Sequence, residues 1–220
     1  ACNDAKLEER PDESGASGWT LIGDPTEGAM IVAAAKAGYL QDAVAQTLPR
    51  VQEIPFDSDR KRMTTLHRNT RAGADGSGFE FPALCAVVKG APDVVLDLCT
   101  AMLDNGRIVP LSHAMRGVIV EQNHDMAGQA LRVLGVAFRP LDAMPASMTP
   151  EAVEHDLVFV GLLGMIDPPR AEVIEALKVA RGAGLKTVMV TGDYKDTAEA
   201  IARDIGLRTP GGLVLTGADI

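Results

Sequence analysis

Oxygen-bearing side chains follow two apolar segments that are predicted to be neighbouring strands of a parallel sheet. Asp167 comes after the first of these segments, and Thr191, Gly192 and Asp193 come after the second. Ligands bind outside the carboxyl ends of parallel strands, because those ends meet at one edge of the sheet. A hydroxyl group and two carboxylates at such an edge suit a phosphate group and a magnesium ion. The alternative is that these side chains only cap strands and form turns.

A second group of candidates consists of cations and one aromatic residue. Lys89 ends an apolar segment just before a predicted helix start at Pro92, where the helix dipole does not favour a lysine. A bound anion would explain this position, and an exposed lysine at a strand end is the alternative. Phe56 lies in a polar, turn-prone stretch and could stack on a nucleotide base or be an ordinary core residue. Arg60 and Arg62 are expected to face solvent.

Other residues also have both a binding and a structural interpretation. Lys61 could neutralise phosphate, with Met63 packed beside the aromatic ring. Glu27 lies three residues after Asp24, which is the spacing of a capping box, so its carboxylate could bond back to the helix start instead of binding a ligand. Arg132 stands at the end of a long predicted helix, where a cation stabilises the helix itself. The four histidines have no spacing that indicates a metal or catalytic site.

The elements that must position these residues change in pattern near residue 150. Before it, the predicted strands are 19–22, 51–56, 63–67, 79–89 and 132–138, the predicted helices are 25–37, 92–102 and 112–130, a helical turn is predicted at 2–9, and 71–78 and 140–150 are predicted loops. After it, apolar strands at 156–165, 186–190 and 213–215 alternate with helices at 169–180 and 196–205. Such alternation is typical of a parallel sheet covered by helices. We predict an α/β fold with an antiparallel sheet in domain 1–150 and a partial Rossmann-like parallel sheet in domain 151–220.

Composition limits the classes of function. The 220 residues carry a net charge of −9, which disfavours nucleic acid and anionic membrane surfaces as partners. A polyanionic ligand would therefore need a local cluster of cations. The longest apolar run, 157–166, has the length of a strand, so we expect no direct membrane insertion by this chain. Three widely spaced cysteines outside any metal-ligand pattern indicate buried thiols in a reducing compartment.

Six motifs together resemble the P-type ATPases, the ATP-driven cation pumps. In family order they are Asp24-Pro25-Thr26-Glu27, Phe56 with Asp59-Arg60-Lys61-Arg62-Met63, Lys89-Gly90-Ala91-Pro92, Ala130-Leu131-Arg132-Val133-Leu134, Gly164-Met165-Ile166-Asp167-Pro168-Pro169-Arg170 and Met189-Val190-Thr191-Gly192-Asp193. Their forms are most similar to the calcium-pump branch. The resemblance implies a nucleotide-binding domain followed by part of a haloacid-dehalogenase-type phosphorylation domain.

The resemblance also implies roles for particular residues. ATP, with Mg2+, would bind among Glu27, Phe56, Lys61, Met63, Lys89, Gly90 and Arg132. In the parent pump, the γ-phosphate would pass to an aspartate in an Asp-Lys-Thr-Gly-Thr segment, which this sequence lacks. Asp167, Thr191, Gly192 and Asp193 would hold the phosphoryl group and support a metal site that is incomplete in this chain. The partners would be transmembrane and actuator domains of the same polypeptide, and this soluble, by itself inactive part would lie at the cytoplasmic face of a membrane.

Two positions depart from the family pattern, and two other functions stay open. Tyr194 stands where asparagine often follows Thr-Gly-Asp, and Ser58 stands where arginine is common, which weakens a phosphate clamp there. One alternative is a haloacid-dehalogenase-like phosphatase with a large cap domain, which would need an Asp-x-Asp pair that the sequence lacks. The other is a non-catalytic ATP-binding module. The transported ion would be selected by membrane helices, so calcium depends on the motif resemblance alone.

Overall fold

The computed structural model describes residues 1–11, 17–70, 81–129, 131–166, 170–191, 195–209, 211–216 and 219. The chain forms two compact units. The first consists of Ala1–Arg116 and Leu134–Leu163, and the second of Gly117–Val133 and Gly164–Ile220. The first unit holds most of the strands, and the second is mainly helical.

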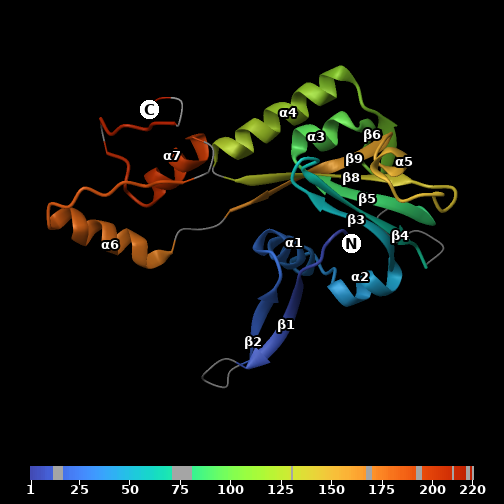
Figure 1. Cartoon of the computed structure of the whole chain (residues 1–220), viewed down its shortest axis with the longest axis horizontal. Coiled ribbons are helices and arrows are strands. Elements are labelled where there is room, and N and C mark those ends of the chain that lie inside the picture. Colours follow the sequence, from blue (N-terminus) through green and yellow to red (C-terminus); the bar gives the residue numbers. More distant parts are fainter. Residues whose placement is uncertain are drawn as a thin grey trace. The chain divides into compact units, whose positions relative to one another are not determined.

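Seven strands, most of whose residues belong to the first unit, form one sheet (Figure 1). They are β3 (Arg50–Asp57), β4 (Arg62–Arg68), β5 (Leu84–Gly90), β6 (Cys99–Asp104), β7 (Arg107–Pro110), β8 (Arg132–Pro140) and β9 (Leu157–Met165), in the spatial order β3-β4-β5-β8-β9-β6-β7. β3, β4, β5 and β8 pair antiparallel, as predicted. β6 and β9 pair parallel, so the complete sheet is mixed.

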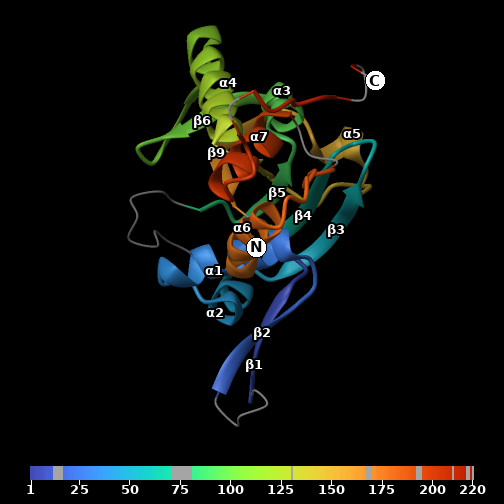
Figure 2. The same cartoon turned by 90° about the vertical axis from the view of Figure 1, so that its left-hand side faces the viewer.

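Helices cover both faces of this sheet (Figures 1 and 2). α1 (Pro25–Lys36) and α2 (Gln41–Thr47) lie on one face, and α3 (Pro92–Asp97) and α5 (Pro150–Val153) lie on the other. Successive strand residues point to opposite faces, so each strand contributes to both sides. On the α5 side, Leu66, Leu84, Ala86 and Val153 form a buried apolar cluster. The sheet can therefore hold a binding site on one face while the other face supports it.

The start of α1 follows from its sequence. The Asp24 carboxylate accepts a hydrogen bond from the backbone N–H of Thr26 at 2.7 Å, and Pro25 occupies the first turn. Both features favour helix initiation, and the predicted helix is confirmed. The chain before it is different: β1 (Lys6–Pro11) pairs antiparallel with β2 (Ser17–Ile22). The helical turn predicted at 2–9 is wrong, because cross-strand bonds to β2 replace local ones.

The helix predicted at 92–102 is also too long. α3 ends at Asp97, and the following residues form β6, which turns back into β7. The turn uses Asn105 and Gly106, whose φ angles of 46° and 76° are both positive. Asn-Gly is a strong signal for such a two-residue hairpin turn, and it outweighs the apolar pattern that suggested a longer helix.

The remaining predictions before residue 166 agree with the structure, except that the strand predicted at 79–89 begins only at Leu84, as β5. α4 (His113–Gly128) and β8 correspond to the predicted helix 112–130 and strand 132–138. The predicted loop 140–150 lacks helix and strand except at its two ends, where Pro140 ends β8 and Pro150 begins α5. The predicted loop 71–78 lies outside the described residues. The strand predicted at 156–165 is confirmed as β9, but its neighbours are β8 and β6.

The second unit contains α6 (Ala171–Gly182) and α7 (Lys195–Asp204), close to their predicted positions. The strands predicted at 186–190 and 213–215 are wrong, because these segments have no regular structure. Val188, Val190 and Leu213 are 79%, 91% and 84% exposed. An apolar strand is stable when neighbouring strands pair with it and helices cover it, and these residues have neither environment. The Rossmann-like sheet is therefore not confirmed, and the division at residue 150 stays a prediction.

Candidate functional site

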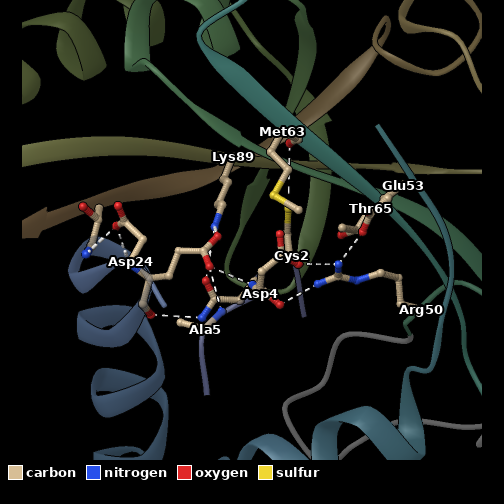
Figure 3. Close-up of polar contacts among 12 residues, drawn as sticks. Cys2, Asp4, Ala5, Asp24, Arg50, Glu53, Met63, Thr65 and Lys89 are labelled. Atoms are coloured by element: carbon tan, nitrogen blue, oxygen red, sulfur yellow. Dashed lines mark hydrogen bonds and ion pairs between the residues drawn. The ribbon is translucent and has the colours of Figure 1, made fainter. Parts of the chain in front are cut away.

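Lys89 lies on the face of the sheet that α1 and α2 cover (Figure 3), where it forms an ion pair with Glu27 of α1. The Lys89 Nζ donates to Glu27 Oε1 and, at 3.2 Å, to Asn3 Oδ1. The two charged side chains are only 10% and 14% exposed. Ionised groups this far from water need a partner, which each supplies to the other. The carboxylate also lies in the first turn of α1, where the helix dipole favours a negative charge.

The Glu27 carboxylate also organises the N-terminal segment. Its Oε2 accepts from the backbone N–H groups of Asp4 and Ala5, both at 2.8 Å. In return, the Asn3 amide donates to the Glu27 carbonyl at 3.0 Å. Asp24 therefore caps α1, whereas the side chain of Glu27 bonds to Lys89 and to residues far away in sequence. This arrangement fixes the lysine and the carboxylate side by side.

Strand β4 contributes Met63 to the same place. Met63 is the cross-strand partner of Lys89 and is 2% exposed. The Cys2 thiol donates to the Met63 carbonyl at 3.7 Å (Figure 3). Burial raises the pKa of Cys2 and outweighs the Thr65 hydrogen bond and the nearby positive charges, so this thiol is protonated at neutral pH. Arg50 ties the segment to β3, donating to Asp4 Oδ1 at 2.5 Å.

Phe56 lies near the end of β3, and Lys61 lies in the turn that joins β3 to β4. Phe56 is 64% exposed, which excludes the alternative that it is a core residue. Lys61 is exposed and has a φ of 52°. Its carbonyl accepts from the backbone N–H of Ala91 at 2.9 Å, so the turn contacts the segment that follows Lys89. An exposed aromatic ring and an exposed cation are thus carried on a turn that is joined to β5.

Gly90 allows this close contact. A Cβ atom at this position would lie 2.5 Å from the Lys61 carbonyl oxygen and 2.9 Å from the Cα of Arg62. Backbone atoms cannot move aside as the end of a flexible side chain can. The glycine is therefore required by the approach of the turn.

Replacing Gly90 by alanine is expected to lower the free energy of unfolding by about 1–3 kcal/mol, because the added methyl overpacks the turn. Urea unfolding measures the change. Gly117→Ala is the matched control: its Cβ would meet nothing within 4 Å, and in the interior of α4 alanine should stabilise by about 0.5–1 kcal/mol. Equal stability of Gly90→Ala and the unsubstituted chain would contradict the packing argument.

An apolar cavity of about 320 Å³ adjoins Lys89 within the first unit. Its walls include Ile31 from α1, Val44 from α2 and Val87 from β5. His67 also lines it; its Nδ1 donates to the Leu48 carbonyl at 2.8 Å, so its Nε2 accepts from the Thr65 hydroxyl. Burial lowers the pKa of His67, which is consistent with a neutral ring. In the part of the chain that the structure describes, no group of His, Cys, Asp or Glu is suited to hold a metal ion.

The other predicted site residues belong to the second unit or lie outside the described residues. Arg132 begins β8 four residues after α4 ends at Gly128, and it belongs to the second unit, so its predicted place at a helix end is wrong. Thr191 is exposed and lies in an irregular segment. Asp167, Gly192 and Asp193 lie outside the described residues. The geometry described above is therefore that of the residues predicted to bind the nucleotide. The roles of the residues predicted to act in phosphoryl transfer stay predictions.

Sequence reasoning missed three residues that build the site. Asn3 and Arg50 hold the N-terminal segment beside Lys89 and β3. Glu154 binds Arg60 and Arg62, which were expected to face solvent and instead have side chains only 21% and 16% exposed. Glu154 is 92 and 94 residues away from these partners, so no local pattern could have indicated the contacts.

Chemically, the site offers a donor and an acceptor side by side. The Lys89 ammonium group and the Glu27 carboxylate are held side by side on one face of the sheet. The ammonium group can donate a hydrogen bond to a polar ligand, and the carboxylate can accept one. Their charges compensate each other, so the pair can orient a ligand through hydrogen bonds but contributes little net charge. The exposed ring of Phe56 and the exposed charge of Lys61 supply what the pair lacks: a stacking surface and a free cation for an anionic group.

Comparisons with known proteins agree with the motifs. A family model described as "P-type ATPase, cytoplasmic domain N" matches residues 1–172. Cation-transporting ATPase pma1 of Synechocystis is 40% identical over 221 residues, covering 100% of this chain and 22% of that protein. Calcium-transporting ATPase 1 of Lactococcus lactis is 36% identical (100% and 23%), and the calcium-transporting ATPase of Bacillus subtilis is 38% identical (98% and 22%).

The chain spans between a fifth and a quarter of the length of these relatives. Among the described residues, no helix combines the length and the apolar character that crossing a membrane requires. The family model covers more than three quarters of the chain, and it includes the Lys89–Glu27 pair and the turn with Phe56 and Lys61. The chain therefore belongs to the P-type ATPase family, and its residues 1–172 match the part known as cytoplasmic domain N.

Proposed function

We propose that the first unit binds MgATP and that the whole protein is an ATP-driven cation pump. The observation that carries the proposal is the turn between β3 and β4, which leaves Phe56 64% exposed and joins Lys61 to the segment after Lys89. An exposed phenylalanine loses the stabilisation of burial, and a stacked base would restore it. Membership of the family and the names of the relatives support the same conclusion.

Each residue then has a separate task in binding. Phe56 stacks on the adenine ring, which contributes about 1–3 kcal/mol by analogy with other base–aromatic contacts. Glu27 accepts from the exocyclic amino group of adenine, and Lys89 donates to a ring nitrogen or a neighbouring oxygen. Lys61 neutralises phosphate charge, a task that the motif resemblance also gives to Arg132. Met63 and Gly90 shape the floor of the pocket, one by its buried side chain and the other by having none.

In the whole pump, this domain positions ATP for phosphoryl transfer. A carboxylate oxygen of an aspartate outside this chain attacks the γ-phosphorus, the bond to the β-phosphate oxygen breaks, and ADP leaves. Residues 151–220 would belong to a Rossmann-like phosphorylation domain, in which Asp167, Thr191, Gly192 and Asp193 hold the phosphoryl group and assist Mg2+. The aspartyl phosphate would drive transport of a cation, calcium in this proposal, through transmembrane helices beside an actuator domain, with the present domain on the cytoplasmic side.

The decisive test is a titration of the chain with MgATP, followed by amide NMR shifts. We expect a dissociation constant between about 10 μM and 1 mM, since a domain that delivers its ligand need not hold it tightly. Phe56→Ala is expected to raise this constant roughly fivefold to a hundredfold, because 1–3 kcal/mol of stacking is lost. Trp19→Ala removes another exposed aromatic ring, 70% exposed on β2, and should have no effect. Unchanged affinity in Phe56→Ala would refute the stacking role.

A further inference from the structure

A fully buried carboxylate contacts the turn that follows Phe56 and the start of β4. The Glu154 side chain is 0% exposed. Its Oε1 accepts from Arg60 Nη1 at 2.7 Å and from the Thr64 hydroxyl at 2.6 Å, and its Oε2 accepts from Arg62 Nε at 2.6 Å. All three donors belong to the turn or to the start of β4. One carboxylate thus gathers three side chains of the same short segment.

The backbone that carries Glu154 is itself fixed. Val153, the preceding residue, is fully buried in the apolar cluster of the α5 face. The backbone N–H of Glu154 donates to the Pro150 carbonyl at 2.7 Å, and Arg139 from β8 donates to the Ala152 carbonyl at 2.9 Å. The carboxylate therefore extends from a support that is anchored in the core and in a central strand.

Glu154 approaches the turn from the face opposite the Lys89–Glu27 pair. Met63 and Thr64 are consecutive residues of β4, so their side chains point to opposite faces. Met63 pairs with Lys89 on the α1 face, whereas Thr64 binds Glu154 on the α5 face. The carboxylate can therefore hold the turn without occupying the place of a ligand.

Arg60 links the carboxylate to the residue before Phe56. Its Nη2 donates to the Pro55 carbonyl at 2.7 Å while its Nη1 binds Glu154. The strand register shifts between Ile54 and Asp57, so Phe56 lies in an irregular part of β3 that the regular ladder does not hold. Arg60 supplies the missing restraint, and its own position depends on Glu154.

We propose that Glu154 is a positioning residue of the nucleotide site, which acts through Arg60 to hold Phe56 in the conformation that receives ATP. This inference rests on the proposed function. Glu154 does not touch the nucleotide. The carboxylate is ionised at neutral pH: burial would raise the pKa of Glu154, but the hydrogen bonds from Thr64, Arg62 and Arg60 outweigh burial and hold that pKa below its ordinary value.

The test uses Glu154→Gln in the 220-residue chain, titrated with MgATP at a temperature where circular dichroism shows the variant folded. We expect the dissociation constant to rise roughly threefold to thirtyfold, since a loosely held stacking residue must be ordered on binding. Glu151→Gln, the same change at an exposed position of α5, should leave affinity unchanged. In a Phe56→Ala background, Glu154→Gln should change affinity less than twofold, because the residue that it positions is absent.

The outcomes separate this inference from the proposed function. If the unsubstituted chain does not bind MgATP, the proposed function fails. If it binds, and folded Glu154→Gln binds equally well, only the positioning role is overturned. An equal loss of affinity with and without Phe56 would also overturn it, since Glu154 would then act elsewhere. Should Glu154→Gln not fold, Arg60→Leu carries the test, because it removes the link to Pro55 while Arg62 remains on Glu154.

Discussion

Replacing Lys89 by methionine is expected to raise the dissociation constant for MgATP about tenfold to a hundredfold. The change removes a hydrogen bond from a charged donor, worth about 1.5–3 kcal/mol, while it keeps most of the side-chain volume. It also leaves the Glu27 carboxylate, only 14% exposed, without its cation. Loss of one partner from a buried ion pair costs about 3–5 kcal/mol, so urea unfolding should show a large loss of stability. Calorimetric titration below the unfolding transition measures the binding.

A second substitution separates binding from stability. In Lys89→Met with Glu27→Gln, no uncompensated charge remains, so the double variant should recover much of the stability that Lys89→Met loses. ATP affinity should stay low, because both ligand contacts are absent or weakened. Lys178→Met, at an exposed lysine on α6, is the control for removal of a positive charge. Affinity that recovers together with stability would show that Lys89 has only a structural role.

Local signals in the sequence were sufficient where the structure depends on local bonds. Asp24 and Pro25 predicted the start of α1, and the apolar segments predicted β4, β5 and β9. Asn105-Gly106 is also a local turn signal, whereas the helix predicted at 92–102 followed the apolar pattern before it. The strand predicted at 186–190 is wrong for a different reason. Apolar residues form a strand only when other strands pair with them, and an apolar pattern cannot show whether such neighbouring strands are present.

The residues of the candidate site also fall into two groups: those that the sequence indicated and those that only the structure revealed. The motifs identified Lys89, Glu27 and Met63, which the structure brings together from β5, α1 and β4. Sequence alone left Phe56 undecided between core and surface, because an aromatic residue after a proline fits both, and only its exposure decided it. Asn3 and Glu154 could not be found, since their importance comes from partners 86 or more residues away. Long-range polar contacts leave no periodic trace in a sequence.

Glu154 is expected to control the acid stability of the first unit. Its pKa in the folded chain lies below the ordinary value, because the hydrogen bonds from Thr64, Arg62 and Arg60 outweigh burial. A carboxyl with a lowered folded pKa stabilises the fold above its unfolded pKa of about 4.3 and loses this contribution as pH falls through the folded value. At pH 7, Glu154→Gln should therefore lower the free energy of unfolding by about 3 kcal/mol, since two partly buried arginines lose their counter-charge.

The pH dependence distinguishes this charge effect from a simple loss of packing. Glutamine has nearly the same volume as glutamate and cannot ionise, so the difference in unfolding free energy between Glu154→Gln and the unsubstituted chain should shrink as pH falls below about 4. Urea unfolding at pH 7, 5, 4 and 3 measures it, with Glu151→Gln as the exposed control. A difference that stays constant down to pH 3 would mean that the arginines do not depend on the charge of Glu154. A shrinking difference would identify the buried carboxylate as the group that fixes the turn, and the same charge would then be required for Phe56 to meet its ligand.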